Sequence, residues 1–526
     1  MIKGIKITAN KIILALYLVL ICIASIFLYV THNKLYLAGI IIVGLVLFFF
    51  VAHFLLEYAG RIRLGRQSDV TDRQCVMAFL ISTLICLVIT AVWFIAFRPG
   101  SYEQDNIAQL KQAISGEYDS WHPIWHTLVF FTLPYKLTGR AESVVVFQMI
   151  CFSISVGYMF MVLYRYIGMV YAVIAASYVM LNPFTGFILL FPFKDVPFAT
   201  AGTLAMAMTA QIFFSGGEWS GKWYKCALLG FMLTNATLFR YNGVLLTGMI
   251  LLALLFNVKF RQWIVIAAGF ALTMIVIQGP VYHGLNAHIS KTDVVQTVGF
   301  PMSIIGNAVK ETPEVIDQDI VDFAYSYAPR EVWEERYNRG NFNLMKYGGA
   351  WNPGVVEEAG AGRIVSMAAR CMVQSPQASM DAIFALTDFV YGIDIQDKAD
   401  IDIMKNRIIE NELGLDYNGV WKLGSLFDKY AAALKLRGWN FFRKLGFGIL
   451  LVIIVILSRL RWTSAASWKR VLICLPILAY DFGTMLLLSG HDARFFFVSF
   501  LVCPITIAMG LYEPAYTVAA ERQEDT

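Results

Sequence analysis

Long apolar blocks make up most of this chain, and their length limits what it can fold into. Each block is close to the ~20 apolar residues that an α-helix needs to cross a membrane. Only 15 % of the 526 residues are charged, against roughly 25 % in a typical soluble domain. The blocks lie at residues 11–30, 35–54, 75–97, 143–163, 168–190, 196–214, 224–239, 243–257, 262–281, 446–460, 470–488 and 495–512. The sequence therefore predicts an all-α polytopic membrane protein with about 12 transmembrane helices. No small-residue cleavage site follows the first block, so we expect it to be a retained signal anchor.

Basic residues predict how the chain is oriented, because Lys and Arg collect in cytoplasmic loops. They precede the first block, follow the second, and separate the blocks at 446–460 and 470–488. They are Lys3, Lys6, Lys11, Arg61, Arg63, Arg66, Arg73, Arg459, Arg461, Lys469 and Arg470. Both chain ends are therefore expected in the cytoplasm, with segments 98–122, 282–445 and 489–494 on the extracytoplasmic side. This distribution accounts for the formal net charge of +5, so no nucleic-acid partner is expected.

A short apolar block at 123–138 leaves the number of crossings open. The two ends of the chain agree in orientation only if an even number of spans lies between residues 122 and 282, and counting 123–138 would make that number odd. We therefore expect 123–138 to be a juxtamembrane helix that begins at Pro123. Within the region after residue 282, segment 311–345 is expected to be helical and segment 348–362 to be a loop.

The predicted organisation has four parts. They are two transmembrane helices with a cytoplasmic loop at 1–74, a transmembrane core at 75–281 with the first outer loop at 98–122, a mainly helical extracytoplasmic insertion at 282–445, and C-terminal transmembrane helices with a short cytoplasmic tail at 446–526.

Ionisable residues beside membrane spans are costly and are usually paired or functional, and five clusters of them fall on the predicted outer side. The clusters are Tyr102, Glu103, Asp105 and Asp119; His122 and His126; Lys194 and Asp195; Arg240 and Asn242; and His491, Asp492 and Arg494. A carboxylate of the first cluster, either Glu103 or Asp105, could serve as a general base. The cations could hold a phosphate, as a point charge from lysine or as a bidentate guanidinium.

Each cluster also has an ordinary structural explanation. An acidic outer loop follows from the positive-inside rule, Lys194 and Asp195 could neutralise each other, and Arg240 could extend to the lipid headgroups. The spacing of His122 and His126 suits a metal ion on one helix face, but the sequence shows no third ligand, so no metal-ligating set is predicted. Taken together, cations opposite a carboxylate favour transfer from a lipid-phosphate donor.

The order of these motifs resembles the GT-C superfamily of membrane glycosyltransferases. The resemblance is strongest to a branch of Gram-positive bacterial membrane proteins related to protein O-mannosyltransferases and lipid A aminoarabinose transferases, and it covers most of the chain from about residue 75. The motifs that carry it are Tyr102-Glu-Gln-Asp105, Gly116-Glu-Tyr-Asp-Ser-Trp-His122-Pro, Phe193-Lys-Asp-Val-Pro197, Leu238-Phe-Arg-Tyr-Asn-Gly243 and His491-Asp-Ala-Arg494-Phe.

The resemblance implies a helical membrane core with juxtamembrane helices and a mixed soluble domain, in a bacterial plasma membrane. It implies transfer of a sugar, with inversion, from a polyprenyl-phosphate donor to a cell-surface acceptor. Asp105 then matches the catalytic carboxylate, while His122, Arg240 and Arg494 match phosphate-contacting positions. Relatives often carry two adjacent acidic residues in the first loop, whereas here Gln104 separates Glu103 from Asp105, so the identity of the base stays open. Some members use Mg²⁺ or Mn²⁺ and others do not.

Two other functional classes use lipid-linked sugars. A transporter or flippase predicts repeated halves or helices broken at the membrane midplane, and the sequence shows no internal repeat. A polymerase or ligase of surface polysaccharide would differ in its donor, an oligosaccharide on a pyrophosphate. A nucleotide-binding site is not expected, because no Walker-type loop and no Rossmann fingerprint occurs in the sequence.

Overall fold

The computed structural model describes residues 6–30, 34–65, 70–289, 294–347, 351–393, 407–434 and 444–513. Every regular element in these ranges is a helix, and the only β-pairings are isolated bridges. Six helical stretches there are long and apolar enough to cross a membrane: Leu37–Arg61, Asp72–Ala96, Glu142–Tyr166, Asp195–Phe214, Phe260–Gly284 and Ala493–Leu511. The expected all-α architecture is confirmed for the described residues. Several of the remaining predicted blocks form shorter apolar helices.

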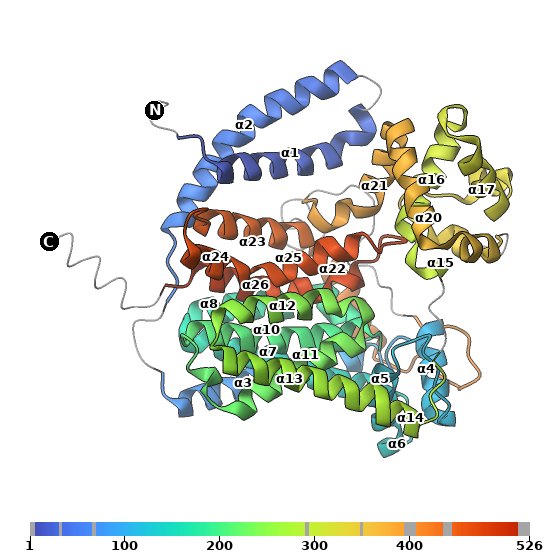
Figure 1. Cartoon of the computed structure of the whole chain (residues 1–526). Helices are drawn as coiled ribbons and strands as arrows, with labels where there is room; N and C mark the ends of the chain where they lie inside the picture. Colours follow the sequence, from blue (N-terminus) through green and yellow to red (C-terminus); the bar gives the residue numbers. More distant parts are fainter. Residues whose placement is uncertain are drawn as a thin grey trace.

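The main body is a bundle whose helices run roughly side by side (Figure 1). They are α1 (Ala9–Val30), α2 (Lys34–Arg61), α3 (Asp72–Ala96), α7 (Glu142–Tyr166), α8 (Met169–Met180), α10 (Asp195–Phe214), α11 (Trp223–Phe239), α12 (Val244–Asn257), α13 (Phe260–Val276), α23 (Leu445–Arg459), α25 (Leu475–Met485) and α26 (Phe497–Leu511). Helix α10 is the centre of this bundle, because nearly all of its residues are buried against α7, α11 and α26.

Two of the predicted apolar blocks are interrupted, and proline explains both interruptions. In block 168–190, α8 ends at Met180, and a new helix, α9 (Pro183–Ile188), begins after Asn182, whose side chain accepts a hydrogen bond from the Phe184 amide. In block 470–488, α24 (Ala465–Leu472) gives way to α25, which carries Pro476 in its first turn. Proline lacks the amide hydrogen that a helix interior needs, but it fits the first turn of a new helix.

The segment around the short block is helical but irregular. It consists of α5 (Ile124–His126), a π-helical stretch η1 (Thr127–Thr132) and α6 (Leu133–Thr138). It packs against α4 (Gln104–Ser115) of the first loop. In Figure 1 these elements share the right-hand end of the bundle with α14 (Tyr282–Gly284), which continues α13 through the π-helical stretch η4 (Ile277–Val281), whereas α24 lies at the left-hand end.

The helices described between residues 294 and 434 are divided between two hydrophobic cores. The elements α15 (Val294–Thr297), α16 (Gly299–Glu311), α17 (Gln318–Tyr327), α18 (Arg330–Arg336), α19 (Asn343–Lys346) and α20 (Pro353–Gln374) enclose a core of their own. The second half of α21 (Pro376–Tyr391) and α22 (Trp421–Leu434) instead join the core of the main bundle. There the Phe427 ring stacks on Trp93 of α3 with ring centroids 3.9 Å apart. The expected loop at 348–362 is wrong from residue 353 on, because α20 begins at Pro353 and is kinked at Gly360.

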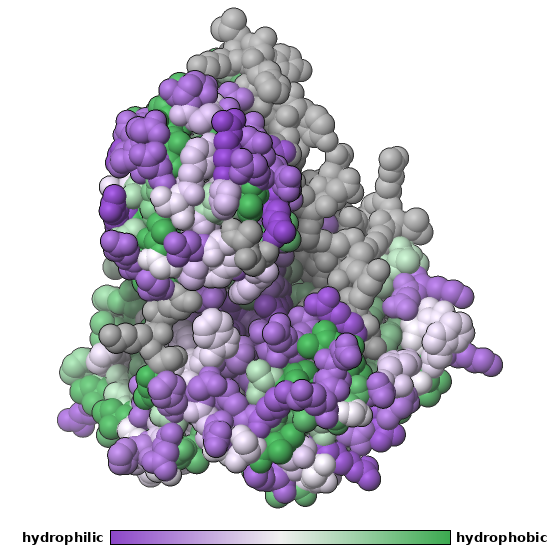
Figure 2. Space-filling view, turned by 90° about the vertical axis from the view of Figure 1, so that its right-hand side faces the viewer, coloured by the Kyte–Doolittle hydropathy of each residue, from purple (hydrophilic) through white to green (hydrophobic). Residues whose placement is uncertain are grey.

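The right-hand end of the molecule is the polar end. Viewed from that side, the surface is mostly hydrophilic and is hollowed beneath the upper lobe, which holds α16, α17 and α20 (Figure 2). The first loop, the start of α10 and the turn before α26 all reach this end, so it is where the predicted site residues can meet.

Candidate functional site

The first loop is fastened to the segment that precedes α10. The Asn106 side chain, in the first turn of α4, accepts a hydrogen bond from the Glu103 amide (3.1 Å) and donates one to the carbonyl oxygen of Pro192 (3.1 Å). Gly100 has a positive φ of 109°, and a Cβ there would lie 2.9 Å from the Leu190 carbonyl oxygen, so the close approach of the two segments requires glycine. These contacts bring Asp105 near Lys194, although the two residues are 89 positions apart in the sequence.

The segment between α9 and α10 forms turns and no regular helix, and a side chain of a neighbouring helix binds two of its carbonyl groups. The Gln148 side-chain amide of α7 donates to the carbonyl oxygens of Leu189 (2.8 Å) and Phe191 (2.9 Å). Buried carbonyl groups must be satisfied, so this amide fixes the path of the chain into Lys194 and Asp195. Asp195 then occupies the first turn of α10, where the helix dipole favours a negative charge.

A buried ion cluster forms around Asp195. This carboxylate is only 1 % exposed and pairs with Arg240, and its second oxygen lies 3.7 Å from Arg494 Nε. Arg494 also pairs with Asp492, with 2.6 Å between Nε and Oδ2. Two aromatic rings support the guanidiniums: Arg240 lies 4.1 Å from the centroid of the partly buried Phe495, and Arg494 lies 4.3 Å from that of the buried Phe193. Arginine is suited to such a site because its flat head stacks on aromatic faces while it binds anions.

Arg240 is held by a tight junction between two helices. It has an extended backbone between α11 and the short helix η3 (Tyr241–Gly243), and its Nε donates to Asn242 Oδ1 at 2.5 Å. Asn242 in turn donates to the Thr484 hydroxyl of α25 (3.1 Å). A Cβ at Gly243 would lie 2.5 Å from the Ala236 carbonyl oxygen, so this junction requires glycine. The Leu238–Gly243 motif therefore serves to fix one guanidinium.

Lys194 adds a further positive charge, and it forms no ion pair within the part of the chain that the structure describes. Burial lowers the pKa of its ammonium group from 10.5 to about 8, and the charges of Arg240 and Arg494 act in the same direction. A cation held this way gains most from an anionic ligand, because a phosphate oxygen would offset both the burial and the repulsion.

Asp105 is the accessible acid of the site. Its side chain is 50 % exposed, and its Oδ1 lies 3.9 Å from Nε2 of the buried His122. Burial lowers the pKa of His122 to about 4, with the Lys194 charge acting in the same direction. His122 is therefore neutral at pH 7, and a neutral imidazole offers one N–H donor without adding charge. The structure thus brings Asp105, His122, Lys194, Asp195, Arg240, Asp492 and Arg494 into one electrostatic group.

The two candidate bases have different surroundings. Glu103 is paired with Arg407, whose Nε donates to its Oε1 at 2.7 Å. Asp105 has no such cation on its carboxylate among the described residues. This difference could not be predicted from sequence, because Arg407 lies 304 residues further along the chain. A base must be free to accept a proton, so the geometry favours Asp105.

The remaining predicted residues lie around the cluster in supporting positions. Asp119 accepts hydrogen bonds from Gln112 (2.9 Å) and from the Trp121 amide (2.9 Å), which shapes the loop before His122. The buried Tyr102 hydroxyl donates to the Ala141 carbonyl oxygen (2.8 Å). His491 was predicted to bind phosphate, but its Nε2 lies 3.6 Å from Asp388 of α21.

Metal ligation finds little support in the arrangement of side chains. Over the described ranges, no group of three or more His, Cys, Asp or Glu residues could hold a metal ion. His126 lies deeper than His122, and its Nδ1 is 2.9 Å from Gln109 Nε2.

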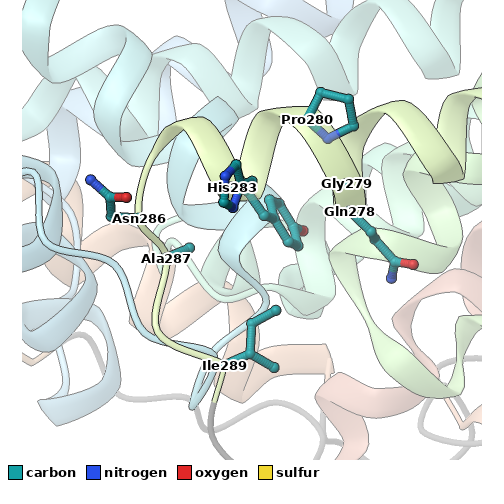
Figure 3. A pocket seen from close by; sticks show the side chains of 8 residues that line it. Gln278, Gly279, Pro280, His283, Asn286, Ala287 and Ile289 are labelled. Carbon is teal, nitrogen blue, oxygen red and sulfur yellow. The ribbon is translucent and has the colours of Figure 1, made fainter.

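A separate pocket lies beside the first loop, at the end of α13 and α14 (Figure 3). It has a volume of about 700 Å³ and includes Gln278, His283 and Asn286 among its lining residues. Tyr282, which also lines it, accepts a hydrogen bond from the Trp125 amide at 3.1 Å. None of the charged residues of the ion cluster lines this pocket.

Comparison with known proteins adds no assignment. No protein-family model matches the chain, and neither the curated proteins nor the solved structures give a match.

Proposed function

We propose that this protein is an inverting membrane glycosyltransferase that moves a sugar from a polyprenyl-phosphate donor to an extracytoplasmic acceptor. One observation carries the proposal: an accessible carboxylate, Asp105, lies in the same electrostatic group as the largely buried cations Lys194, Arg240 and Arg494. Transfer from a lipid phosphate needs a base for the acceptor and positive charge for the leaving phosphate. The motif resemblance to the GT-C superfamily supports the same assignment.

The proposed reaction has a single displacement step. The acceptor hydroxyl oxygen attacks C1 of the donor sugar while its proton passes to the Asp105 carboxylate. The bond between C1 and the phosphate oxygen breaks, and its electron pair leaves with the polyprenyl phosphate. Lys194, Arg240 and Arg494 stabilise the charge that develops on that phosphate. The step is written with the side chains of this chain alone and assigns no part to a metal ion.

The proposal includes a topology. Twelve spans would leave both chain ends in the cytoplasm of a bacterium and place the Asp105 end of the bundle on the extracytoplasmic face. The bundle's long apolar helices and the hydrophilic surface at that end support this arrangement. The acceptor would be a hydroxyl on a cell-surface glycan, lipid or protein.

Sugar transfer from a panel of radiolabelled polyprenyl-phosphate hexoses tests the proposal directly. Purified full-length protein in lipid nanodiscs should consume at least one donor. Asp105→Asn should lower that rate by about 10²- to 10⁴-fold, the usual contribution of a general base. Glu103→Gln, a carboxylate change two residues away, serves as the matched control. If Asp105→Asn is as active as wild type, Glu103 is the base; if no donor is bound or consumed, the glycosyltransferase assignment fails.

A transporter or flippase of lipid-linked sugars is the second candidate, and one observation favours it. Helix α8 is interrupted before α9, and a non-helical stretch then leads into α10 with Lys194 at its start. Interrupted helices whose ends point at anionic substrates are typical of transporters. In sealed vesicles, a flippase would move the labelled donor across the membrane without breaking the sugar–phosphate bond. A polysaccharide polymerase or ligase would instead consume only a pyrophosphate-linked oligosaccharide.

A further inference from the structure

A second group of arginines lies at the other end of the bundle. Helix α26 begins just after Arg494 and ends just before Glu513, so a helix of about 22 Å separates the two groups. Glu513 is surrounded by three arginines from different parts of the chain: Arg63 follows α2, Arg459 ends α23, and Arg470 belongs to α24. We call Arg63, Arg459, Arg470 and Glu513 the Glu513 cluster.

The Glu513 cluster is closely connected. Glu513 Oε1 lies 3.1 Å from Arg459 Nη1 and 3.9 Å from Arg470 Nη1, and Arg63 contacts the same oxygen. The backbone around Glu513 is fixed, because its amide donates to the Leu64 carbonyl oxygen (2.8 Å) and the Leu64 amide donates to that of Leu511 (2.9 Å). The geometry therefore depends on the fold and is not a chance meeting of surface side chains.

Positive charge exceeds negative charge in this cluster. Three guanidiniums meet one carboxylate, and Arg461 lies close enough to repel the Arg459 charge further. The Arg459 side chain is only 8 % exposed, and its Nε has no hydrogen-bond partner within the described ranges. A buried guanidinium with an unsatisfied donor is costly. An additional anion would supply both the missing charge and the missing acceptor.

The surroundings place this cluster at the depth of lipid headgroups. Trp462 and Trp468 pack edge to face next to it, with ring centroids 5.5 Å apart. The half-exposed Trp462 donates from its indole N–H to Asn10 Oδ1 (2.6 Å), which ties α1 to the same end. Tryptophan is enriched where a membrane meets water, and basic pockets between transmembrane helices bind phosphate-bearing headgroups.

We propose that the Glu513 cluster binds a phosphate group. The side chains of Arg63 and Arg470 are 47 % and 32 % exposed, so a ligand can reach them from solvent, and it would share the guanidiniums with Glu513. A phosphodiester of an anionic lipid headgroup and free inorganic phosphate offer the same oxygen atoms. This binding is independent of the sugar transfer proposed above, because it uses none of the residues at the Asp105 end.

Native mass spectrometry of the full-length protein tests the proposal, with phosphatidylglycerol, phosphatidylcholine and inorganic phosphate as separate probes. Phosphatidylglycerol retained in preference to phosphatidylcholine identifies a lipid headgroup, and retention of phosphate alone identifies the free ion. Arg63→Gln and Arg470→Gln should each weaken the retained ligand about fivefold, the fold-change that corresponds to losing one direct hydrogen bond of about 1 kcal/mol to the phosphate. Lys469→Gln is the control, since it removes an equal charge from an exposed position on α24.

Glu513→Gln separates the proposal from a purely structural role of the cluster. If a phosphate shares these arginines, removing the competing carboxylate tightens its binding and the phosphate raises the melting temperature of the variant. If Glu513 is only an internal counterion, the variant is destabilised and no phosphate probe restores it. That result, or equal retention of charged and neutral lipids by wild type and by Arg63→Gln, would overturn the proposal.

Discussion

The two ends of α26 carry two groups of arginines that look alike and differ in their balance of charge. At the Asp105 end, Arg240 and Arg494 share Asp195, Arg494 has a second carboxylate in Asp492, and Asp105 lies beside His122. At the Glu513 end, three arginines share one carboxylate among the described residues. The first group therefore approaches neutrality without a ligand, and the second does not.

The difference extends to the kinds of side chain present. The Asp105 end combines an accessible carboxylate, a neutral histidine and a lysine whose pKa is lowered to about 8. The Glu513 end is built from guanidiniums, which stay protonated at any physiological pH. Groups that can gain or lose a proton are what acid–base chemistry requires. Arginines around a carboxylate therefore indicate anion binding alone. Catalysis is favoured only where titratable groups, such as those at the Asp105 end, lie beside them.

The largest effect should come from breaking the buried pair at the Asp105 end. Asp195→Asn leaves two buried guanidiniums without their shared carboxylate, and removing one partner of a buried pair typically costs about 3–5 kcal/mol. The variant should melt well below wild type in detergent and lose donor binding. The double variant Asp195→Asn with Arg240→Met should recover part of the lost stability. If the single variant melts like wild type, Asp195 does not hold the cluster together.

The next largest effect should be a pH dependence of ligand binding that distinguishes the Asp105 end from the Glu513 end. As the pH rises through 8, Lys194 loses its proton, so donor affinity should fall by about fivefold between pH 8 and pH 9, in proportion to the protonated fraction of a group with a pKa of about 8. The folded protein then holds fewer protons than the unfolded chain between pH 8 and the ordinary lysine pKa of 10.5, so this group makes the folded state more stable as pH rises over that range.

Lys194→Arg provides the matched control for that series. Its donor affinity should stay constant from pH 7 to pH 9, because arginine keeps its charge. Lipid binding at the Glu513 cluster should also be constant over this range in both proteins. A donor affinity that is flat with pH in wild type would mean that Lys194 does not contact the phosphate.

Hydrophobic patterning predicted much of the helix layout. Block 224–239 corresponds to α11 (Trp223–Phe239) and block 243–257 to α12 (Val244–Asn257), because apolar runs of this length have few other ways to satisfy their backbone. Two helix starts were not predicted, although each has an N-cap residue that is recognisable in the sequence. Asn182 and Asn352, each followed by proline, start α9 and α20, yet the first lies inside an apolar run and the second in a segment expected to be a loop.

The candidate site was predicted as a set of residues, and the structure brings most of them together. Adjacent residues such as Lys194 and Asp195 can be recognised as one motif, but their partners come from 45 and 299 residues further along the chain, Arg240 and Arg494. The supporting residues Asn106 and Gln148 were missed, since a buried amide inside a helix has no distinctive pattern in sequence. Such contacts depend on the tertiary fold, and the pairing of residues distant in the chain cannot be predicted from one sequence.

The smallest effect should come from the carboxylate that the sequence could not distinguish from Asp105. Glu103 pairs with Arg407, whose side chain is 61 % exposed, and exposed pairs contribute about 0–1 kcal/mol. Glu103→Gln should therefore change the melting temperature only slightly and keep sugar transfer within about threefold of wild type, since an effect of that size corresponds to well under 1 kcal/mol. Adding salt should shrink even this difference, because water and ions screen an exposed pair more than the buried Asp195 cluster. A loss of activity in Glu103→Gln as large as that in Asp105→Asn would show that the first loop works as one acidic unit, and the contrast between a structural and a catalytic carboxylate would have to be abandoned.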